Sequence, residues 1–283
     1  MVKKYKMEEI GDSGFFRIIA LKDFRDVKAG DLGGVIESEH NLSQEGDCWV
    51  YLSAIARGNA VVKDNAVLLG FSIIKDNAMA GENAIIKDCA SIEDKATISG
   101  CAEVGGYAEV SGHSVICENA KISGDCEISE RAYISGNAIV TDNAVISGNA
   151  EVFGNAKVYY DQQVVYGKLD KDVFATKDWA QAIYNLYGIL PVNNKVILYK
   201  YLNKYFTSSY DNSFKYPKKG EVSVDEYDTS IQASCASGLH FADPCYWSGD
   251  VLIAAEIDLN DIITVQEGKV RVKKANILGE VKL

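Results

Sequence analysis

The chain contains very little proline and no long apolar run. Only three of its 283 residues are proline, and no apolar stretch approaches the roughly 20 residues that a membrane-spanning helix needs. The first residues, MVKKYKMEEIG, lack the apolar core of a secretory signal peptide. These absences favour a soluble, cytoplasmic protein that has no membrane partner.

Basic charge and paired cysteines are also scarce. The 29 basic residues are outnumbered by 40 acidic ones, which gives a net charge of −11 and disfavours a broad nucleic-acid-binding surface. The seven cysteines are an odd number, and no two of them form a CxxC pair. We therefore expect reduced thiols rather than disulfides or a zinc site, no bound metal and no nucleic-acid partner.

What the chain has in abundance is a six-residue repeat. From Asp47 to Tyr160 it passes through nineteen consecutive units without an insertion, as in NAVVKD, KATISG and NAVISG. Position two is Ala in fifteen units, and position four is Ile, Val or Leu in all but two. These two positions share one face of an extended strand, because side chains alternate along it. Position six is almost always Gly, Asp or Glu, and Gly and Asp tolerate the left-handed backbone of a tight corner.

Short strands joined by corners at a constant period predict a solenoid. A six-residue unit cannot bury its own apolar face, so successive coils must stack to form a continuous core. The repeat resembles that of the hexapeptide-repeat, left-handed parallel β-helix proteins, in which three units make one triangular coil. The resemblance implies the left-handed winding, and nineteen units then make about six coils. A β-solenoid of another cross-section is the alternative, which the unbroken period disfavours.

Residues 1–46 precede the repeat and are expected to cap it. Lys3–Met7 and Phe15–Leu21 flank a Gly-Asp-Ser-Gly turn signal and predict a β-hairpin. A solenoid has an open edge at its end, so a cap is expected there. The stretch Ala29–Tyr51 is similar to the opening of a group of bacterial and phage hexapeptide-repeat proteins that are labelled transferases, which implies the fold and the cap.

The transferase resemblance directs attention to histidine. Many hexapeptide-repeat proteins are acyltransferases that use a His as general base in a cleft between subunits, and His suits this role near neutral pH. The repeat offers His113, at position one of the unit HSVICE. Such sites also use a loop extruded from a corner, and this repeat has no insertion. The pattern therefore favours His113 as a replacement for Asn at a solvated corner over a catalytic residue.

Position three of each unit points outward, so residues eighteen apart lie above one another on one face. One such column is apolar over most of its length and consists of Val61, Met79, Thr97, Val115 and Tyr133. A contiguous apolar stripe usually marks a contact surface. Self-association, most often threefold in the resembled family, is favoured over docking of the chain's own second domain. We therefore expect a homo-oligomer, in the form of a trimer.

The repeat is assigned to residues 47–166, and residues 167–283 have the composition of an α+β domain. A helix is expected from Lys177 to Tyr187, with Thr176 as its N-cap and Gly188 after it. Strands are expected in the segments DVLIAAEIDL, DIITVQEGKV and RVKKANILGEV. Residues 196–280 resemble an uncharacterised domain found beside repeat proteins in phages and bacteria, in the segments ILYKYLN, SSYDNSFKY, CASGLHFAD and EGKVRVKKANILGE.

The segment GLHFAD, followed by CYWSG and VLIAAEIDL, also resembles part of the catalytic core of poly(ADP-ribose) polymerases and related ADP-ribosyltransferases. The resemblance implies a nicotinamide pocket in which His240 takes the place of the family's tyrosine. Tyr246 or Trp247 would form the second wall by stacking. Lys200 is the best match to the residue that holds NAD on the first core strand.

The catalytic glutamate of that family has only Glu280 as a counterpart, in an ordinary-looking final strand. Binding of NAD or a related nucleotide is therefore favoured over transfer chemistry, and packing of His240 in a purely structural domain carries equal weight. Lys269, Arg271 and Lys273 alternate along the penultimate strand. They suit either a phosphate-binding edge or a charged edge strand that discourages aggregation, and we favour the second.

Two classes of function follow from these patterns. In the favoured one the chain is a non-catalytic scaffold or binding protein of phage origin. Its β-helix is then an oligomerisation post, that is, a rigid support through which copies of the chain associate. Its C-terminal module binds a nucleotide-like ligand or a host protein. In the alternative it is a transferase, either an acyltransferase in an intersubunit groove near His113 or an ADP-ribosyltransferase at His240.

Overall fold

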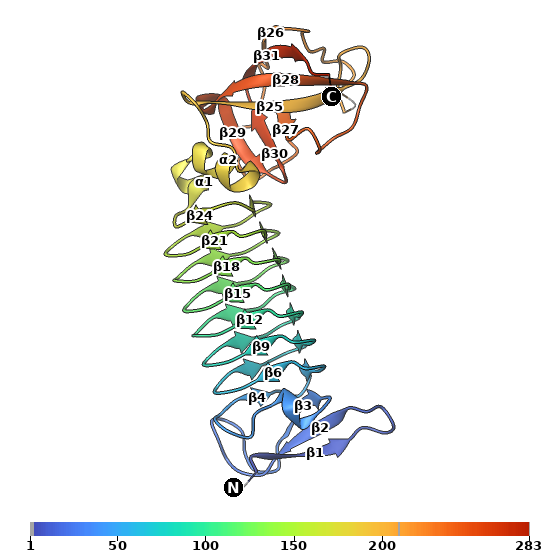
Figure 1. The fold of residues 1–283 in the computed structure, drawn as a ribbon, viewed down its shortest axis with the longest axis vertical. Helices are drawn as coiled ribbons and strands as arrows, with labels where there is room; N and C mark the ends of the chain where they lie inside the picture. The colour runs from blue at the N-terminus through green and yellow to red at the C-terminus, as the bar shows by residue number, and fades with distance from the viewer. Residues whose placement is uncertain (1–2, 209, 283) are drawn as a thin grey trace. The chain divides into compact units, whose positions relative to one another are not determined.

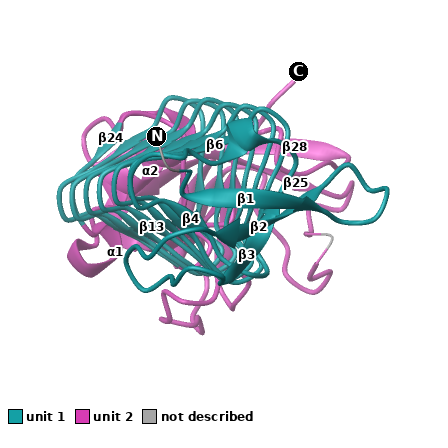
Figure 2. Cartoon of the chain, turned by 90° about the horizontal axis from the view of Figure 1, so that it is seen from below, with its two compact units in different colours: residues 1–159, 168–171 teal, residues 160–167, 172–283 magenta. Residues whose placement is uncertain are grey.

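A computed structural model describes residues 3–208 and 210–282 of the chain (Figure 1). The chain divides into two compact units, coloured separately in Figure 2. Unit 1 runs from the N-terminus to Tyr159 and includes Lys168–Lys171, and unit 2 comprises Tyr160–Gly167 and Asp172–Leu283. The domain boundary predicted at residues 166 and 167 therefore falls in the stretch where the chain crosses between the units.

Unit 1 begins with three strands of a cap, β1 (Tyr5–Glu9), β2 (Phe16–Ala20) and β3 (Leu32–Ile36). The pairs β1–β2 and β2–β3 are antiparallel, which confirms the predicted hairpin. β3 then pairs in parallel with β5 (Ile55–Ala56), so the cap sheet continues into one face of the solenoid. A short 3-10 helix, η1 (Glu39–Asn41), follows β3.

The rest of unit 1 is a parallel β-solenoid whose strands are two residues long (Figure 1). Within the repeat, each strand is formed by positions three and four of a unit, and the strands stack into three faces. The first face continues from β3 and β5 with β8 (Ile73–Ile74), β11 (Ser91–Ile92), β14 (Glu109–Val110), β17 (Glu127–Ile128) and β20 (Val145–Ile146). The second face contains β4 (Trp49–Val50), β7 (Val67–Leu68), β10 (Ile85–Ile86), β13 (Glu103–Val104), β16 (Lys121–Ile122), β19 (Ile139–Val140) and β22 (Lys157–Val158). The third face contains β6 (Val61–Val62), β9 (Met79–Ala80), β12 (Thr97–Ile98), β15 (Val115–Ile116), β18 (Tyr133–Ile134), β21 (Glu151–Val152) and β24 (Lys168–Leu169).

The predicted parallel solenoid with a β cap is thus confirmed, but the prediction of about six coils is too low. Each face of unit 1 has seven strands. The repeat itself supplies the nineteen strands from β4 to β22. Of the other two, β24 follows the repeat and pairs with β21, and β3 belongs to an additional coil before Asp47, where β3 pairs with β5 and Leu42 forms a parallel bridge to Val62. This coil lacks the alternation of small and aliphatic residues. It is recognisable only by its backbone hydrogen bonds, such as the one from Ser43 N to Val62 O at 2.9 Å.

The core of the solenoid is filled by positions two and four, which are buried in every unit of the repeat. Successive coils are joined by a ladder of backbone hydrogen bonds. Val115 N donates to Ala132 O, and Cys117 N to Ile134 O, both at 2.9 Å. Because equivalent peptides bond to one another, a residue lies directly above the one eighteen positions later.

Position six forms the corner and has a left-handed backbone in every unit from Gly58 to Tyr160. Where it is Asp or Glu, the carboxylate often accepts a hydrogen bond from the position-six amide one coil later. Examples are Asp88 with Gly106 N at 2.9 Å and Glu118 with Gly136 N at 2.7 Å. A hydrogen bond to a charged acceptor stabilises by about 1.5–3 kcal/mol, which offsets the cost of that backbone at a non-glycine residue.

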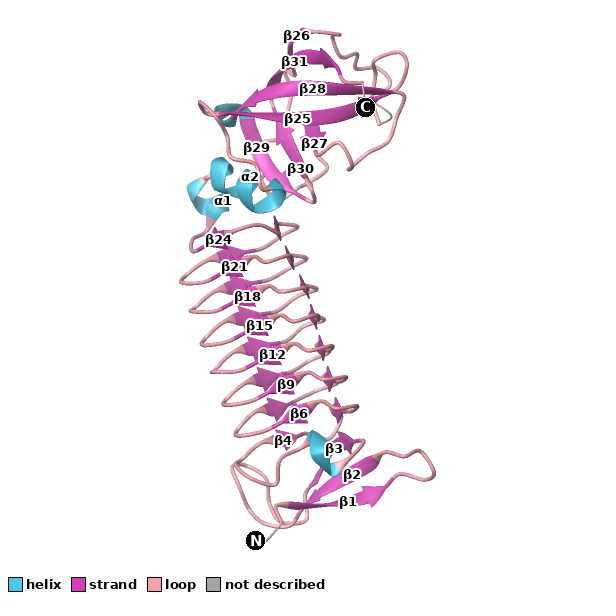
Figure 3. Ribbon diagram, viewed as in Figure 1, coloured by secondary structure: helices cyan, strands magenta, loops and turns pink. Residues whose placement is uncertain are grey.

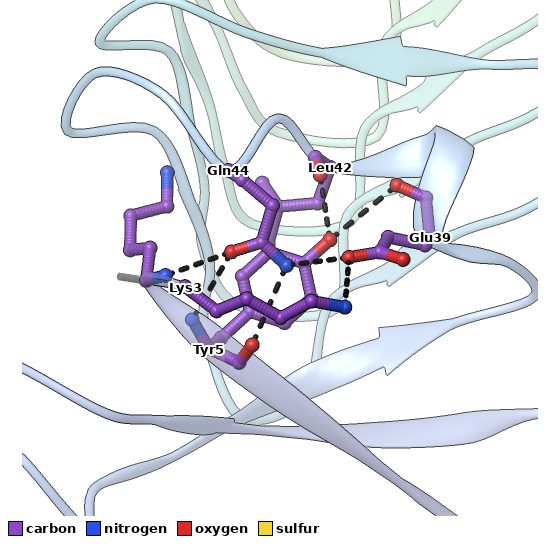
Figure 4. Close-up of polar contacts among 6 residues, drawn as sticks. Lys3, Tyr5, Glu39, Leu42 and Gln44 are labelled. Atoms are coloured by element: carbon purple, nitrogen blue, oxygen red, sulfur yellow. Dashed lines mark hydrogen bonds and ion pairs between the residues drawn. The ribbon is translucent and has the colours of Figure 1, made fainter. Parts of the chain in front are cut away.

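The cap is held to the first coil by a polar network around Gln44 (Figure 4). Gln44 Oε1 accepts from Tyr5 N at 3.3 Å, and its Nε2 donates to Glu39 Oε1 at 2.8 Å. The Tyr5 hydroxyl donates to Leu42 O at 2.6 Å, and Lys3 Nζ donates to Glu39 at 2.8 Å. These contacts fix β1 across the open end of the solenoid.

Two buried side chains, Lys4 and Trp49, complete the cap over the open end of the solenoid. Lys4 Nζ donates to Cys48 O at 2.9 Å and to Gly46 O at 3.3 Å, which satisfies peptide oxygens that no further coil can reach. Burial lowers the pKa of Lys4. Trp49, 1% exposed, packs edge-on against Tyr5 and Phe24. The cap therefore closes the end of the second face.

Unit 2 consists of one antiparallel sheet with a small helical segment before it (Figure 3). The segment contains β23 (Gln163–Val164), α1 (Val173–Thr176) and α2 (Trp179–Tyr187). The sheet has the order β26 (Gly220–Ser223), β31 (Lys274–Glu280), β28 (Val251–Asp258), β25 (Lys195–Leu202), β27 (Leu239–Ala242), β30 (Lys269–Val272) and β29 (Ile262–Gln266). A 3-10 helix, η2 (Leu259–Asp261), joins β28 to β29.

The predicted helix is present as α2, but it starts later than expected. Its N-cap is Asp178, which accepts from Gln181 N at 3.0 Å, and Gly188 ends it in the left-handed conformation. Thr176 instead ends α1, because the left-handed backbone of Lys177 interrupts the helix there. The predicted N-cap at Thr176 is therefore wrong.

Separate substitutions of an inward-facing and an outward-facing residue on the same strand test this organisation. Ile128 is fully buried at position four, so Ile128→Ala should lower the free energy of unfolding by about 2–5 kcal/mol through loss of burial and a cavity. Glu127 is exposed and stacks on Glu109, so Glu127→Ala should be neutral or slightly stabilising. Urea unfolding followed by circular dichroism measures both, and equal effects of the two changes would contradict the assignment of faces.

Candidate functional site

One corner of the solenoid is hollowed into a groove of about 810 Å³. The groove follows the corner across five consecutive coils and is lined by the position-six and position-one residues of each coil. The lining residues are Asp76, Asn77, Asp94, Lys95, Gly112, His113, Glu130, Arg131, Gly148 and Asn149. At about 4.8 Å per coil, the groove is about 19 Å long.

His113 lies at the centre of this groove, between Lys95 and Arg131. All three occupy position one of consecutive coils, and all three are exposed. They form a row of nitrogen-bearing side chains about 10 Å long on an otherwise acidic chain. The same position on this corner is Asn in the coils at Asn77 and Asn149.

The carboxylates on this corner are directed along the solenoid towards backbone amides. Asp94 Oδ2 accepts from Gly112 N at 2.9 Å, and Asp76 Oδ2 accepts from Asp94 N at 3.4 Å. Among the described residues, none forms a hydrogen bond with the His113 ring. The groove thus presents an imidazole with a cation on either side, and no hydrogen bond from a described residue orients the ring.

The predicted apolar column borders the groove. Val61, Met79, Thr97, Val115 and Tyr133 are paired in register along the third face. His113 is two residues before Val115, so the third face begins at the groove corner. Tyr133 is 40% exposed, and its hydroxyl accepts a hydrogen bond from Cys117 Sγ at 3.3 Å.

Lys95 and Arg131 were not singled out from the sequence. The signal that would have identified them is the eighteen-residue spacing, applied to position one as well as to position three. Lys95, His113 and Arg131 are the three consecutive members of one column at which Asn is replaced.

In unit 2, Lys200 lies on the buried face of β25 and is enclosed by aromatic rings. Its Nζ is 4.8 Å from the ring centroid of Trp247 and 5.5 Å from that of Tyr216. It donates to His240 O at 3.1 Å. Burial lowers the pKa of Lys200 to about 8.

Tyr246 joins this group by packing edge-on against Trp247, with ring centroids 4.6 Å apart. Three of the predicted ligand residues, Lys200, Tyr246 and Trp247, are therefore brought together. His240 joins them through its carbonyl oxygen, whereas its ring Nε2 lies 3.3 Å from Ser234 O. Burial, assisted by the charge of Lys200, lowers the pKa of His240 to about 4.

Glu280 lies apart from this cluster. It is exposed at the end of β31, and strands β28 and β25 separate β31 from β27, which carries His240. Three strand spacings correspond to about 14 Å. The structure therefore does not place a carboxylate from Glu280 beside His240.

The interpretation of Lys269 and Arg271 as a charged edge is wrong. β30 is not an edge strand, because it is paired with β27 on one side and β29 on the other. Lys269 is 6% exposed and Arg271 1% exposed. Lys273, after the end of β30, is the partly exposed member, and it forms an ion pair with Asp261 at 3.3 Å.

All seven cysteine thiols are free. Within residues 3–208 and 210–282, His, Cys, Asp and Glu side chains form no group of three or more that would hold a metal ion. In the same part of the chain, no helix has the length and apolarity that crossing a membrane requires.

No protein-family model matches the chain. A stretch of 50 residues, 17% of the chain, is 54% identical to part of the uncharacterized acetyltransferase YdcK of Escherichia coli (strain K12). The match spans 15% of the length of that protein. Together with the parallel β-solenoid, this likeness fits a hexapeptide-repeat, transferase-like β-helix.

The half-buried His240 predicts a loss of stability in acid. Its pKa is about 4 when folded and 6.5 in the reference state, so the unfolded chain binds more protons between these values. The free energy of unfolding should therefore fall as the pH drops from 6.5 to 4, by about 3 kcal/mol at most. His240→Gln should remove this part of the pH dependence in urea unfolding.

The matched control for this prediction is His40→Gln, because His40 is exposed in the cap. This change should leave the acid-induced loss as it is in the wild type. Equal pH dependence in His240→Gln and in the wild type would show that the fold does not lower the pKa of His240.

Proposed function

We propose that the solenoid is an acyltransferase of the hexapeptide type, with its acyl donor bound along the His113 corner. The observation that carries this proposal is the position of His113 in a groove, with Lys95 and Arg131 one coil away on either side. The partial likeness to an acetyltransferase and the hexapeptide solenoid support the same class of reaction.

The three side chains suit the steps of acyl transfer from a thioester such as acetyl-CoA. His113 would remove the proton from the acceptor hydroxyl or amine, whose lone pair then attacks the thioester carbonyl carbon. The carbon–sulfur bond breaks, and the thiol leaves with a proton. Lys95 and Arg131 would pair with phosphate groups of the donor, since charge-assisted hydrogen bonds to phosphate are strong.

The proposed site requires a second copy of the chain. In the part of the chain that the structure describes, the His113 ring has no hydrogen-bond partner to orient it, and the groove lies open on a corner. An interface built on Val61, Met79, Val115 and Tyr133 would bring a partner up to this corner, because the third face starts there. We propose a homo-oligomer of this kind, threefold as in the resembled family, and a cytoplasmic location.

A scaffold or binding function remains a second candidate, and one observation favours it. Unit 2 buries three basic side chains, Lys200, Lys269 and Arg271. Burial of cations is costly and is often retained for function. In this proposal the solenoid is an oligomerisation post, and unit 2 binds a nucleotide-like ligand such as NAD or a host protein. The distance of Glu280 from His240 supports binding rather than ADP-ribosyl transfer.

Replacement of His113 tests the acyltransferase proposal. His113→Ala should lower kcat/KM for acetyl-CoA-dependent acylation by about 10²–10⁴-fold, the usual contribution of a general base. Lys95→Gln with Arg131→Gln should weaken acetyl-CoA binding in calorimetry. Asn119→Ala, a position-one change on another corner, is the matched control and should have no effect. Absence of any acetyl-CoA binding by the wild type would exclude this function.

The interface is tested separately. Val115→Glu combined with Tyr133→Glu places two charges in the apolar column and should shift the assembly towards monomer in light scattering. Val145→Glu introduces the same charge at position three of the first face and should leave the mass unchanged. An unaltered mass in the double variant would mean that the third face is not the interface.

A further inference from the structure

Unit 2 buries an arginine whose donors are only partly used. The Arg271 side chain is 1% exposed, and its Nε and Nη1 have no hydrogen-bond partner among the described residues. Nη2 donates to Ser230 O. An unsatisfied buried donor costs about 1–3 kcal/mol, more when it is charged, so such a group calls for an explanation.

The neighbours of Arg271 make this face of the sheet polar. Strand register places His240 of β27 and Thr264 of β29 opposite Arg271, and Gln266 opposite Lys269. Residues opposite each other or two apart on a strand share a face, so these five side chains lie together. Gln266 Oε1 is also buried without a partner in the described part of the chain.

Lys269 has partners that Arg271 lacks. Its Nζ forms an ion pair with Glu267 and lies 3.0 Å from Cys235 Sγ. Burial lowers the pKa of Lys269, but the hydrogen bonds with Glu267 and Cys235 outweigh this effect and leave it raised. Arg271 forms no ion pair with any described residue. Burial lowers the pKa of Arg271, and the charge of Asp228, in the loop that covers this face, acts against that effect, so the positive charge of Arg271 is only partly compensated.

A loop of residues 228–237 covers the face and supplies neutral acceptors to it. Ser230 O accepts from Arg271, and Ile231 O accepts from Gln266 Nε2 and from Thr264 Oγ1, the latter at 3.2 Å. The loop lies between β26 and β27 and has no strand of its own. Contacts from side chains of the sheet to peptide oxygens therefore hold it in place.

We propose that this face binds a small molecule through an oxyanion, a phosphate or a carboxylate, with Arg271 as the principal ligand. The oxyanion would replace Ser230 O at Nη2 and bring a second oxygen to one of the two nitrogens that lack a partner. This exchange substitutes a charged acceptor for a neutral one, which roughly doubles the strength of the hydrogen bond. The 228–237 loop must move away for the ligand to enter.

The remaining unsatisfied atom narrows the ligand class. Gln266 Oε1 is an acceptor, so it would receive a hydrogen bond from an O–H or N–H group near the oxyanion. A phosphorylated sugar alcohol or an amino acid has such a donor next to its anionic group. The site lies wholly within unit 2 and does not depend on acyl transfer at His113.

The test uses the full chain and two probes, inorganic phosphate and malonate, at constant ionic strength. The wild type should broaden the phosphorus resonance of phosphate or the carbon resonances of malonate, and the probe that binds identifies the type of oxyanion. Arg271→Gln should weaken that binding about tenfold or more. Lys274→Gln is the matched control, because Lys274 forms a partly exposed ion pair with Glu221 on the neighbouring strand.

A second readout follows the loop. The bound anion should increase cleavage by proteinase K within residues 228–237 of the wild type, mapped by mass spectrometry. If Arg271→Gln does not fold, Arg271→Lys keeps the charge without the forked geometry and should also weaken binding. Absence of binding by either probe, equal binding by a folded Arg271 variant, or unchanged cleavage on binding would overturn the proposal.

Discussion

The hydrogen bonds between equivalent peptides of successive coils are the interaction on which unit 1 depends. A bond such as that from Val115 N to Ala132 O sets a register of eighteen residues. Within that register position two must be small, position four must fill the interior, and position six must turn the chain. The cap serves the same ladder, because Lys4 and Gln44 satisfy peptide groups where the coils begin.

Most of the solenoid could be predicted because its period states which side chains share a face. The apolar column from Val61 to Tyr133 follows from the eighteen-residue spacing alone. The first coil could not be predicted, since β3 and Leu42 take part through backbone pairing and do not carry the repeat's side chains. Corner residues were predicted by type, but their carboxylate-to-amide bonds depend on the coil that follows.

The candidate sites were less accessible from the sequence. A catalytic role for His113 was disfavoured because no loop is inserted at its corner, although Lys95 and Arg131 are in the same register. Arg271 was misjudged because strand order is not a local property. The strand that carries Arg271 is internal because residues 239–242, about thirty positions earlier in the chain, pair with it. Lys200 was placed near Trp247 by resemblance, whereas its burial follows from the alternation of β25.

The eighteen-residue register also governs how such a molecule can change its length. Loss of one whole coil brings together residues from the same corner, so every face and every carboxylate-to-amide bond is restored. Loss of a single six-residue unit would turn all later residues by one face and divide the apolar column at the point of the loss. The solenoid can therefore vary its length only in steps of one coil, about 4.8 Å. Such steps would alter the reach from the cap to the His113 corner without altering the corner itself.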